Sequence, residues 1–153
     1  MAAVSLAAYP ILAEDLDECW ALDQVCFADG ETYERRTFHD LIAYPDAICL
    51  KCVGVDGRML GFVIGVVEVD RTGHVVVLGV SPEYRRHGVG RMLMRRLEAV
   101  FLERDVHLLH LEVRTTNDAA RALYEGIGFS IAGRRLAYYT NGDDGYLMVK
   151  RIS

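Results

Sequence analysis

The segment from Val75 to Leu93 (VVVLGVSPEYRRHGVGRML) joins an apolar run to a loop rich in glycine and basic residues. The β-branched run ends at Ser81-Pro82 and an amphipathic pattern follows, so the sequence predicts a strand, a loop and the start of a helix. Gly88 and Gly90 lack Cβ atoms, so a ligand could approach the main chain closely there. The free N–H groups of a helix's first turn, with the helix dipole, suit an anion such as a pyrophosphate.

The loop itself consists of six residues: Arg85, Arg86, His87, Gly88, Val89 and Gly90. Its two arginines would add charge-assisted hydrogen bonds to a phosphate. A pattern this short also fits an ordinary turn with a solvated basic edge, because a motif match is only a hypothesis.

Glu112 is the second residue that could do chemistry, because it lies in an otherwise apolar predicted strand, HLLHLEV. A buried carboxylate needs a partner or a cavity, since burying it unpaired is costly. Glu112 could therefore be an ion-paired or edge-exposed residue, or a general base. His110 shares its strand face by the period-two rule and could be structural or join a proton relay.

Tyr124 lies with other apolar residues on one side of a predicted helix, where an aromatic side chain usually packs in the core. Its phenol, with an ordinary pKa of about 10, is also a suitable proton donor to a thiolate leaving group. Asn117, just before this helix, is a good N-cap.

Composition bounds the class of protein. The chain has 153 residues, of which 52% are hydrophobic and 25% charged, as in one globular domain with a substantial core. A net charge of -5 argues against binding of a nucleic-acid backbone and is compatible with a cationic substrate. No apolar stretch is long enough to span a membrane. The apolar start lacks a preceding Lys or Arg and leads into an acidic helix pattern, so we expect a strand rather than a signal peptide, and a cytoplasmic protein.

The four cysteines all fall in the first third of the chain, and Cys49 and Cys52 form a C-x-x-C. Such a pair could bind a metal or act in redox chemistry. The surrounding AICLKCVGV is typical of a strand, in which residues three apart face opposite sides. We therefore expect buried free thiols and no metal.

The order of elements predicts one domain, residues 1–153, of the mixed α/β class, with about four helices on the faces of a sheet of about seven strands. The turn signal Asp56-Gly57 predicts a hairpin. The predicted strands are 4–11, 47–55, 59–69, 73–80, 107–113, 130–139 and 145–150, and the predicted helices are 14–27, 34–43, 89–104 and 117–127.

Leu111 to Phe129 (LEVRTTNDAARALYEGIGF) resembles the second acetyl-CoA motif of the GNAT acetyltransferase superfamily, and the RRHGVG loop resembles its pyrophosphate motif. The spacing between the two also fits. The tail RRLAYYTNGDDGYLMVK is similar to the closing segment of the Nα-acetyltransferase branch, with the ribosomal-protein alanine N-acetyltransferases (RimI-like) the best match. Asp143-Asp144 stands where that branch usually has Glu-Asp. The likeness covers the chain from Val75 onward.

The resemblance implies a GNAT-like fold and two substrates, acetyl-CoA and the α-amine of a protein N-terminus. Acetyl-CoA would lie between two splayed parallel strands, 73–80 and 107–113, and the amine would attack its thioester directly. The cofactor-binding residues would be Leu78, Gly79 and Val80 through backbone hydrogen bonds, the six loop residues at the pyrophosphate, and Asn117 and Tyr124 near the pantetheine arm.

The same resemblance implies that Glu112 is the general base, acting directly or through water, and that Tyr124 protonates the departing thiolate. Tyr33, Tyr138 and Tyr139 could line the peptide side or simply pack. A single glutamate could suffice as the base for an α-amine, because roughly a third of such amines are neutral near pH 7.4. For a lysine amine the neutral fraction is only ~0.1%.

Two other functions remain open at this stage. One is acetylation of a small amine such as a polyamine, an amino acid or an antibiotic, which a deep closed acceptor pocket would favour. The other is a non-catalytic module that binds acetyl-CoA, which would be expected to lack a well-placed base and acid. The residues leave the oligomeric state undetermined.

Overall fold

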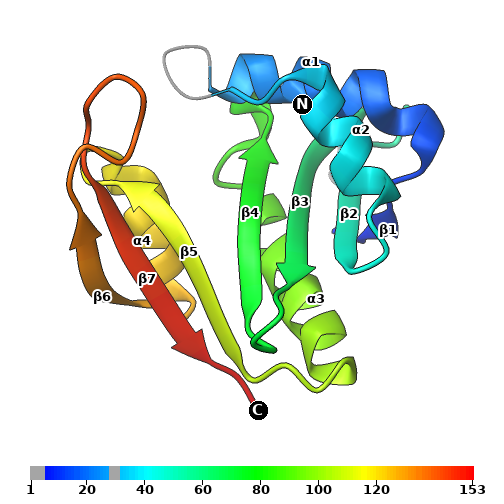
Figure 1. Ribbon diagram of the computed structural model, residues 1–153. Helices are drawn as coiled ribbons and strands as arrows, with labels where there is room; N and C mark the ends of the chain where they lie inside the picture. The colour runs from blue at the N-terminus through cyan, green and yellow to red at the C-terminus, as the bar shows by residue number, and fades with distance from the viewer. Residues whose placement is uncertain (1–5, 28–31) are drawn as a thin grey trace.

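The computed structural model describes residues 6–27 and 32–153, which form one seven-stranded sheet in the order β1-β2-β3-β4-β5-β7-β6 (Figure 1). β4 and β5 pair in parallel, and the other neighbouring strands pair antiparallel. The predicted mixed α/β class, with seven strands and four α-helices in the described residues, is confirmed.

The strands are β1 (Tyr9–Pro10), β2 (Ala47–Val53), β3 (Met59–Val67), β4 (Gly73–Val80), β5 (Leu108–Arg114), β6 (Ser130–Arg135) and β7 (Gly145–Arg151). The helices are α1 (Leu16–Cys26), α2 (Arg35–Ala43), α3 (Val89–Glu103) and α4 (Asp118–Gly126), with short 3₁₀ turns at Ala13–Asp15 and Pro82–Tyr84. α2 ends before Pro45, which disfavours helical conformation in the residue before it. The β2–β3 hairpin turns at Gly57, whose φ of +81° suits glycine.

The predicted strand at residues 4–11 is mostly wrong. Residues 4 and 5 lie outside the described residues, and of the remainder only Tyr9–Pro10 forms a strand. Pro10 has no N–H to donate, which limits pairing at this edge of the sheet. The predicted helix at 14–27 begins later, at Leu16, because the preceding residues form a 3₁₀ turn. The sequence Ala28-Asp29-Gly30, which predicts the end of this helix, lies outside the described residues.

The predicted strand at 130–139 is too long, because β6 ends at Arg135. Ala137 has a φ of +48°, outside the extended β region, and its N–H donates to Asp144 Oδ1 at 2.8 Å. Asp144 also binds Arg134, with 2.7 Å between its Oδ2 and an arginine nitrogen. The carboxylate of Asp144 therefore closes the β6–β7 connection into a turned loop that carries Tyr138 and Tyr139.

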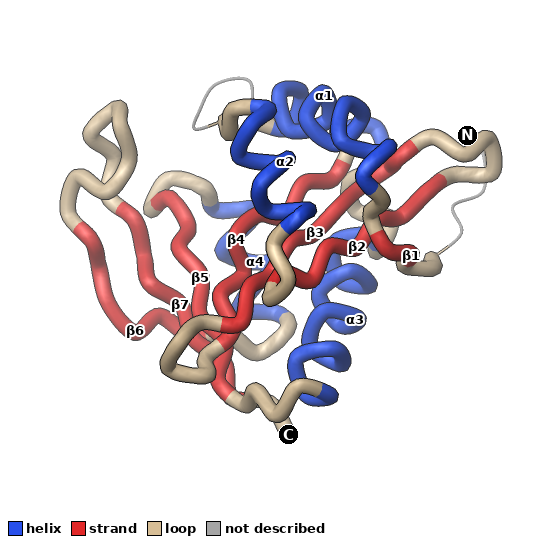
Figure 2. The backbone as a smooth tube through the Cα atoms, turned by 45° about the vertical axis from the view of Figure 1, so that its right-hand side comes forward, coloured by secondary structure: helices blue, strands red, loops and turns tan. Residues whose placement is uncertain are grey.

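Helices cover both faces of the sheet (Figure 2). One core lies on the α3–α4 face and contains Leu93, Leu97 and Phe101 of α3 with Leu109 and Leu111 of β5. A second core lies on the α1–α2 face. Among the described residues, no helix combines the length and apolar composition needed to cross a bilayer.

β4 and β5 are joined over two residue pairs only, Gly73↔Leu109 and His74↔His110. Beyond His74 the two strands diverge toward their C-terminal ends (Figure 1). The pairing of β4 with β3 is also irregular, because Val77 pairs with Ile64 whereas Val75 pairs with Gly65. Val76 is therefore the extra residue of a β-bulge, which bends a strand and turns its side chains. This divergence confirms the two splayed parallel strands that the resemblance implies.

Candidate active site

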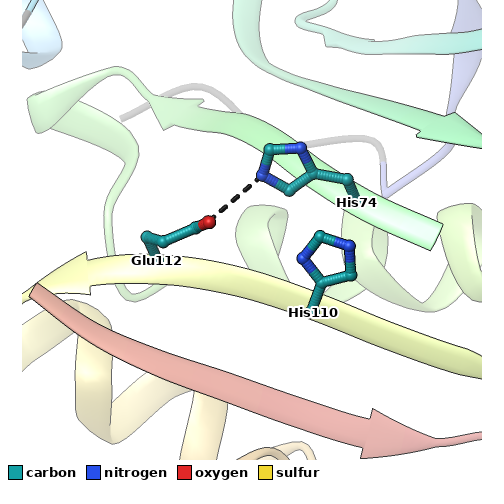
Figure 3. A group of neighbouring side chains, drawn as sticks. All are labelled: His74, His110 and Glu112. Atoms are coloured by element: carbon teal, nitrogen blue, oxygen red, sulfur yellow. Dashed lines mark hydrogen bonds and ion pairs between the residues drawn. The ribbon is translucent and has the colours of Figure 1, made fainter. Parts of the chain in front are cut away.

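The point where β4 and β5 separate carries three polar side chains, His74, His110 and Glu112 (Figure 3). Leu109, Leu111 and Val113 point into the α3–α4 core, so His110 and Glu112 lie on the opposite face of β5. His74 Nε2 lies 3.1 Å from Glu112 Oε2. The Glu112 side chain is 12% exposed, and His74 is the partner that a buried carboxylate requires.

The electrostatics of this pair stabilise the state in which His74 carries a proton and Glu112 is a charged carboxylate. The hydrogen bond from His74 outweighs burial and lowers the pKa of Glu112 below its ordinary value. Burial lowers the pKa of His74, but its hydrogen bonds and attraction to Glu112 and Glu68 prevail and raise it. Burial and the neighbouring His74 lower the pKa of His110.

His110 stacks on His74 with ring centroids 4.7 Å apart and planes 9° from parallel. Ligand atoms of His74, His110 and Glu112 lie within 4.8 Å of one another, a donor set that divalent metals accept. A metal bound by imidazole lies close to the plane of the ring, and parallel stacked rings do not share a plane. The arrangement therefore suits proton transfer better than metal binding.

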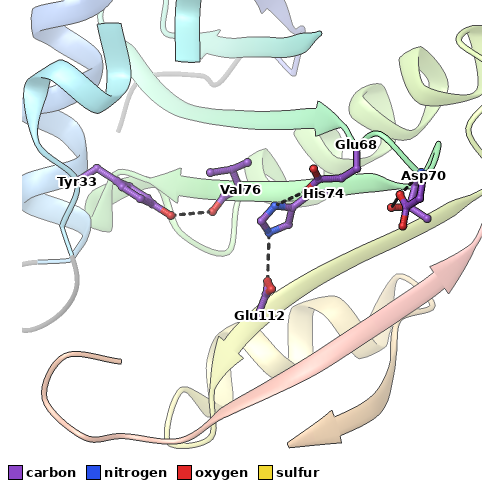
Figure 4. Close-up of polar contacts among 7 residues, drawn as sticks. Tyr33, Glu68, Asp70, His74, Val76 and Glu112 are labelled. Carbon is purple, nitrogen blue, oxygen red and sulfur yellow. Dashed lines mark hydrogen bonds and ion pairs between the residues drawn. The ribbon is translucent and has the colours of Figure 1, made fainter. Parts of the chain in front are cut away.

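Tyr33, from the α1–α2 connection, is held over β4 (Figure 4). Its hydroxyl donates to the carbonyl of Val76, the bulge residue, at 3.4 Å. Asp23 Oδ2 accepts from the Tyr33 N–H at 3.0 Å, and the Gln24 amide donates to the Tyr33 carbonyl at 3.3 Å. Two consecutive residues of α1 thus fix the main chain of Tyr33, and β4 fixes its ring.

Asp23 is fully buried, and its Oδ1 has no hydrogen-bond partner among the described residues. Burial raises the pKa of Asp23 to about 6, although the hydrogen bond from Tyr33 opposes this shift. A buried acceptor without a hydrogen-bond partner is uncommon in folded proteins and often has a structural or functional role. Here the carboxylate holds the segment that carries Tyr33.

Tyr138 and Tyr139 lie in the β6–β7 connection, within the field of Glu112. Their rings meet edge to face at 5.0 Å, and the Arg114 guanidinium lies over the Tyr139 ring at 4.6 Å. Burial and the charge of Glu112 raise the pKa of Tyr138. Burial raises the pKa of Tyr139 to about 12, with smaller contributions from Tyr138, Glu112 and Tyr33. The tyrosines named from the sequence therefore lie near the His74–Glu112 pair, Tyr33 through its contact with Val76 and the other two through the field of Glu112.

The glycine loop leads into α3 as predicted. Gly88 is the helix N-cap with a φ of +83°, and the first helical hydrogen bond runs from Met92 N to Gly88 O. The N–H groups of the three intervening residues consequently have no intrahelical acceptor. Gly90 is buried, and a Cβ there would lie 3.3 Å from Leu123 of α4. The loop therefore has the main-chain donors that a pyrophosphate requires.

The basic side chains of the loop are exposed, and Arg85 turns back toward the fold. Its guanidinium donates to the carbonyls of Val80 and Cys26 at 3.3 and 3.4 Å. The thiol of Cys26 also donates to Val80 O at 3.2 Å. The Val80 carbonyl is thus engaged within the protein, and the expected backbone hydrogen bonds of Leu78, Gly79 and Val80 to the pantetheine arm stay a prediction.

Tyr124 is 9% exposed in the α3–α4 core and packs edge to face on Phe129 at 5.9 Å. Burial raises the pKa of its phenol, so the side chain stays protonated at neutral pH. Asn117 caps α4 by accepting from the Ala120 N–H at 3.1 Å. Cys49 and Cys52 pack in opposite cores, and all four cysteines are free thiols.

Sequence reasoning missed His74, Glu68 and Asp23. The sequence does indicate a buried position for Asp23, because Asp23 continues the helical spacing of Leu16 and Cys19 along the buried stripe of α1. His74 lies in a run of apolar residues that predicts only a strand, and its partners come from elsewhere in the chain.

Comparison with known proteins places this arrangement in a family. The family model described as "Acetyltransferase (GNAT) family" matches residues 10–129. The N-alpha-acetyltransferase RimI of Mycobacterium tuberculosis is 34% identical, with 88% of this chain and 85% of that protein covered. The N-terminal acetyltransferase B complex catalytic subunit NAA20 of Arabidopsis thaliana is 38% identical, with 80% and 73% covered.

A solved structure shows the same fold. The ribosomal-protein-S18-alanine N-acetyltransferase of Escherichia coli superposes with a TM-score of 0.85 at 31% identity, and the match covers 96% of this chain and 94% of that one. Together, the family match, the relatives above 30% identity and the shared fold show that this chain is an enzyme of the acetyltransferase (GNAT) family.

Proposed function

We propose that this enzyme transfers the acetyl group of acetyl-CoA, the acetyl donor of the family, to the α-amine of a protein N-terminus. The observation that carries the proposal is the His74–Glu112 pair, which lies where β4 and β5 separate, near tyrosines from two connections. The relatives named above support a protein acceptor, since their names describe N-terminal or ribosomal-protein acetylation.

The glycine loop and the first turn of α3 would hold the pyrophosphate of acetyl-CoA. The free N–H groups behind Gly88 supply neutral donors, and Arg86 and His87 lie exposed beside them. Leu78 and Gly79 would orient the pantetheine arm along the part of β4 that no longer pairs with β5. Acetyl-CoA supplies the acetyl group as a thioester, and its thiolate is the leaving group.

Glu112 would accept the proton that the α-amine loses, and Tyr124 would give a proton to the departing sulfur. The raised pKa of Tyr124 keeps this proton available at neutral pH. Tyr33 on one side, and Tyr138 and Tyr139 on the other, would form the walls that hold an extended N-terminal peptide. Orientation of two bound reactants supplies much of the acceleration in such reactions, because it can remove about 7–11 kcal/mol of barrier.

Mass spectrometry of a reacted peptide tests the assignment. The peptide would have a free N-terminus and one internal lysine, and a matched peptide would have the same sequence with a blocked N-terminus. We expect label on the α-amine of the first peptide and none on the second. Label on the lysine alone, or on polyamines, amino acids or antibiotics alone in parallel reactions, would refute the proposed acceptor.

A further inference from the structure

His74 lies between two carboxylates that come from different parts of the fold (Figure 4). Its Nε2 is 3.1 Å from Glu112 Oε2, and its Nδ1 is 3.3 Å from Glu68 Oε1. Glu68 follows β3, in the turn that leads into β4. The exposed fraction of the side chains rises along this row, from 12% for Glu112 through 26% for His74 to 41% for Glu68.

Acetylation of an ammonium group leaves one proton over in each turnover. The nitrogen loses two protons on becoming an amide, and the thiolate takes up one, so the other must reach solvent. Within the His74–Glu112 pair the proton is better placed on His74, because each group favours the charged form of the other: the pKa of Glu112 is lowered and that of His74 is raised. An imidazole in contact with the same carboxylate provides a place for it.

We propose, on the basis of the function proposed above, that Glu112 and His74 accept the amine proton as one pair, in which His74 Nε2 holds the proton and Glu68 positions the ring. When Nδ1–H of the neutral ring donates to Glu68, the lone pair lies on Nε2 and faces Glu112. Because the partner of one ring nitrogen decides which nitrogen carries the proton, Glu68 would set this tautomer.

The proton follows a balanced path. The N–H bond of the substrate breaks, the proton passes by way of Glu112 Oε2 to Nε2, and an Nε2–H bond forms. After the transfer, Nε2 gives this proton to water at the partly exposed edge of the ring. Nδ1 keeps its own proton throughout, so each turnover restores the neutral ring and releases one proton.

The charged or titratable groups that act on the His74–Glu112 pair come from three places in the fold: Glu68 from the β3–β4 turn, His110 from β5 and Arg135 from β6. Asp70, also in the β3–β4 turn, acts on His110. Tyr138 and Tyr139 of the β6–β7 connection also lie within the field of Glu112. Because Glu112 and His74 interact strongly, they titrate as a pair, with apparent pKa values that belong to both.

Rates measured between about pH 5.5 and 9, on the acceptor peptide, test the proposal in four proteins: the wild type, His74→Gln, Glu68→Gln and Asp70→Asn. The wild type should lose activity as the pH falls, because the proton then already occupies Nε2. His74→Gln should lower the plateau kcat at least tenfold and abolish this loss. Glu68→Gln should move the loss to lower pH, since it removes a charge that raises the pKa of His74.

Asp70→Asn is the matched control, because Asp70 lies only two residues from Glu68. Its carboxylate accepts hydrogen bonds from the N–H and the hydroxyl of Thr72. Its pH profile should match that of the wild type. Proton NMR titration of the five histidines gives a second readout that needs no acceptor. The His74 resonance, assigned by its absence in His74→Gln, should titrate above about pH 6.5 and shift downward in Glu68→Gln.

A His74→Gln enzyme with wild-type rate and pH profile, or a His74 titration that Glu68→Gln leaves in place, would overturn the inference. These outcomes are separable from failure of the proposed function. A wrong acceptor appears as missing label on the α-amine in the mass spectrum, whereas the NMR titration concerns the protein alone.

Discussion

His74 and His110 are the last residues that pair β4 with β5, and their rings stack with centroids 4.7 Å apart. Backbone pairing and ring stacking thus hold both imidazoles at the point where the strands separate. Glu112 follows two residues later on the same face of β5 and meets His74 at 3.1 Å. A side chain fixed by sheet register needs little reorganisation before a reaction, which is what a proton-transfer group requires.

Replacement of Gly88 should weaken acetyl-CoA binding. Its φ of +83° is unfavourable for other residues, so Gly88→Ala should reshape the turn that presents the first N–H groups of α3. Acetyl-CoA should raise the melting temperature of the wild type by mass action, and this shift should shrink or vanish in the variant.

Gly57→Ala is the matched control for the strain. Gly57 has a φ of +81° in the distant β2–β3 turn, and a Cβ there meets no atom within 4 Å. The control should lose similar stability and keep the full acetyl-CoA shift. A wild type that shows no shift at millimolar acetyl-CoA would contradict the assignment of the loop.

Tyr124→Phe should slow turnover by about 10²-fold or more, because it removes the proton donor to the thiolate. The ring still packs on Phe129, so the melting temperature should change little. Tyr146→Phe, at a half-buried tyrosine near Arg121 and Arg134, serves as control and should retain activity. The measurement is kcat from steady-state kinetics at saturating peptide for the wild type and both variants. Equal rates for Tyr124→Phe and the wild type would assign the leaving-group proton to another donor.

Asp23 should make the protein less stable as the pH rises through the range of about 4 to 6. Its pKa is raised from 3.8 to about 6 in the folded state, so the folded protein binds a proton there that the unfolded chain has lost. Ionisation of Asp23 costs folding free energy up to about pH 6, and the cost is constant above it. The full effect is about 3 kcal/mol, since each pKa unit corresponds to about 1.4 kcal/mol.

Urea unfolding of Asp23→Asn and the wild type, at pH 4 and pH 7, measures this effect. The stability of the variant relative to the wild type should increase by about 2–3 kcal/mol from pH 4 to pH 7. The fixed cost of burying the amide nitrogen cancels in this comparison. Glu14→Gln, at an exposed carboxylate, is the control and should show no such change. A flat difference for Asp23→Asn would contradict a raised pKa of Asp23 in the folded protein.

The element order and the buried faces of α3 and β5 could be predicted because burial imposes periods of 3.6 and 2 residues. His74 could not be predicted in this way. Val75 and Val77 are two residues apart, yet they pack in opposite cores because the bulge at Val76 turns the strand. Alternation counted along β4 therefore assigns the wrong face on one side of the bulge. The contacts of His74 with Glu112 and Glu68 also depend on strand register, which a single sequence does not reveal.

Tyr139→Ala should weaken binding of the acceptor peptide and leave binding of acetyl-CoA intact. The Tyr139 ring lies under the Arg114 guanidinium at 4.6 Å and meets Tyr138 edge to face, so it forms a firm part of the proposed peptide wall. Loss of this surface should raise KM for the peptide about tenfold, equivalent to about 1.4 kcal/mol. The KM for acetyl-CoA should stay within twofold, since the glycine loop lies on other elements. Tyr139→Phe, which keeps the ring, should show a smaller effect.

Tyr44→Ala is the control, because Tyr44 is a 47% exposed tyrosine at the end of α2, outside the proposed peptide wall. Both KM values should stay at wild-type levels in this variant. Initial rates with each substrate varied in turn give both KM values for the wild type and for each variant. An equal rise of both KM values in Tyr139→Ala would point to a general disturbance of the fold. A rise for acetyl-CoA alone would move Tyr139 from the peptide wall to the acetyl-CoA side, and the β6–β7 connection would then have to be reassigned with it.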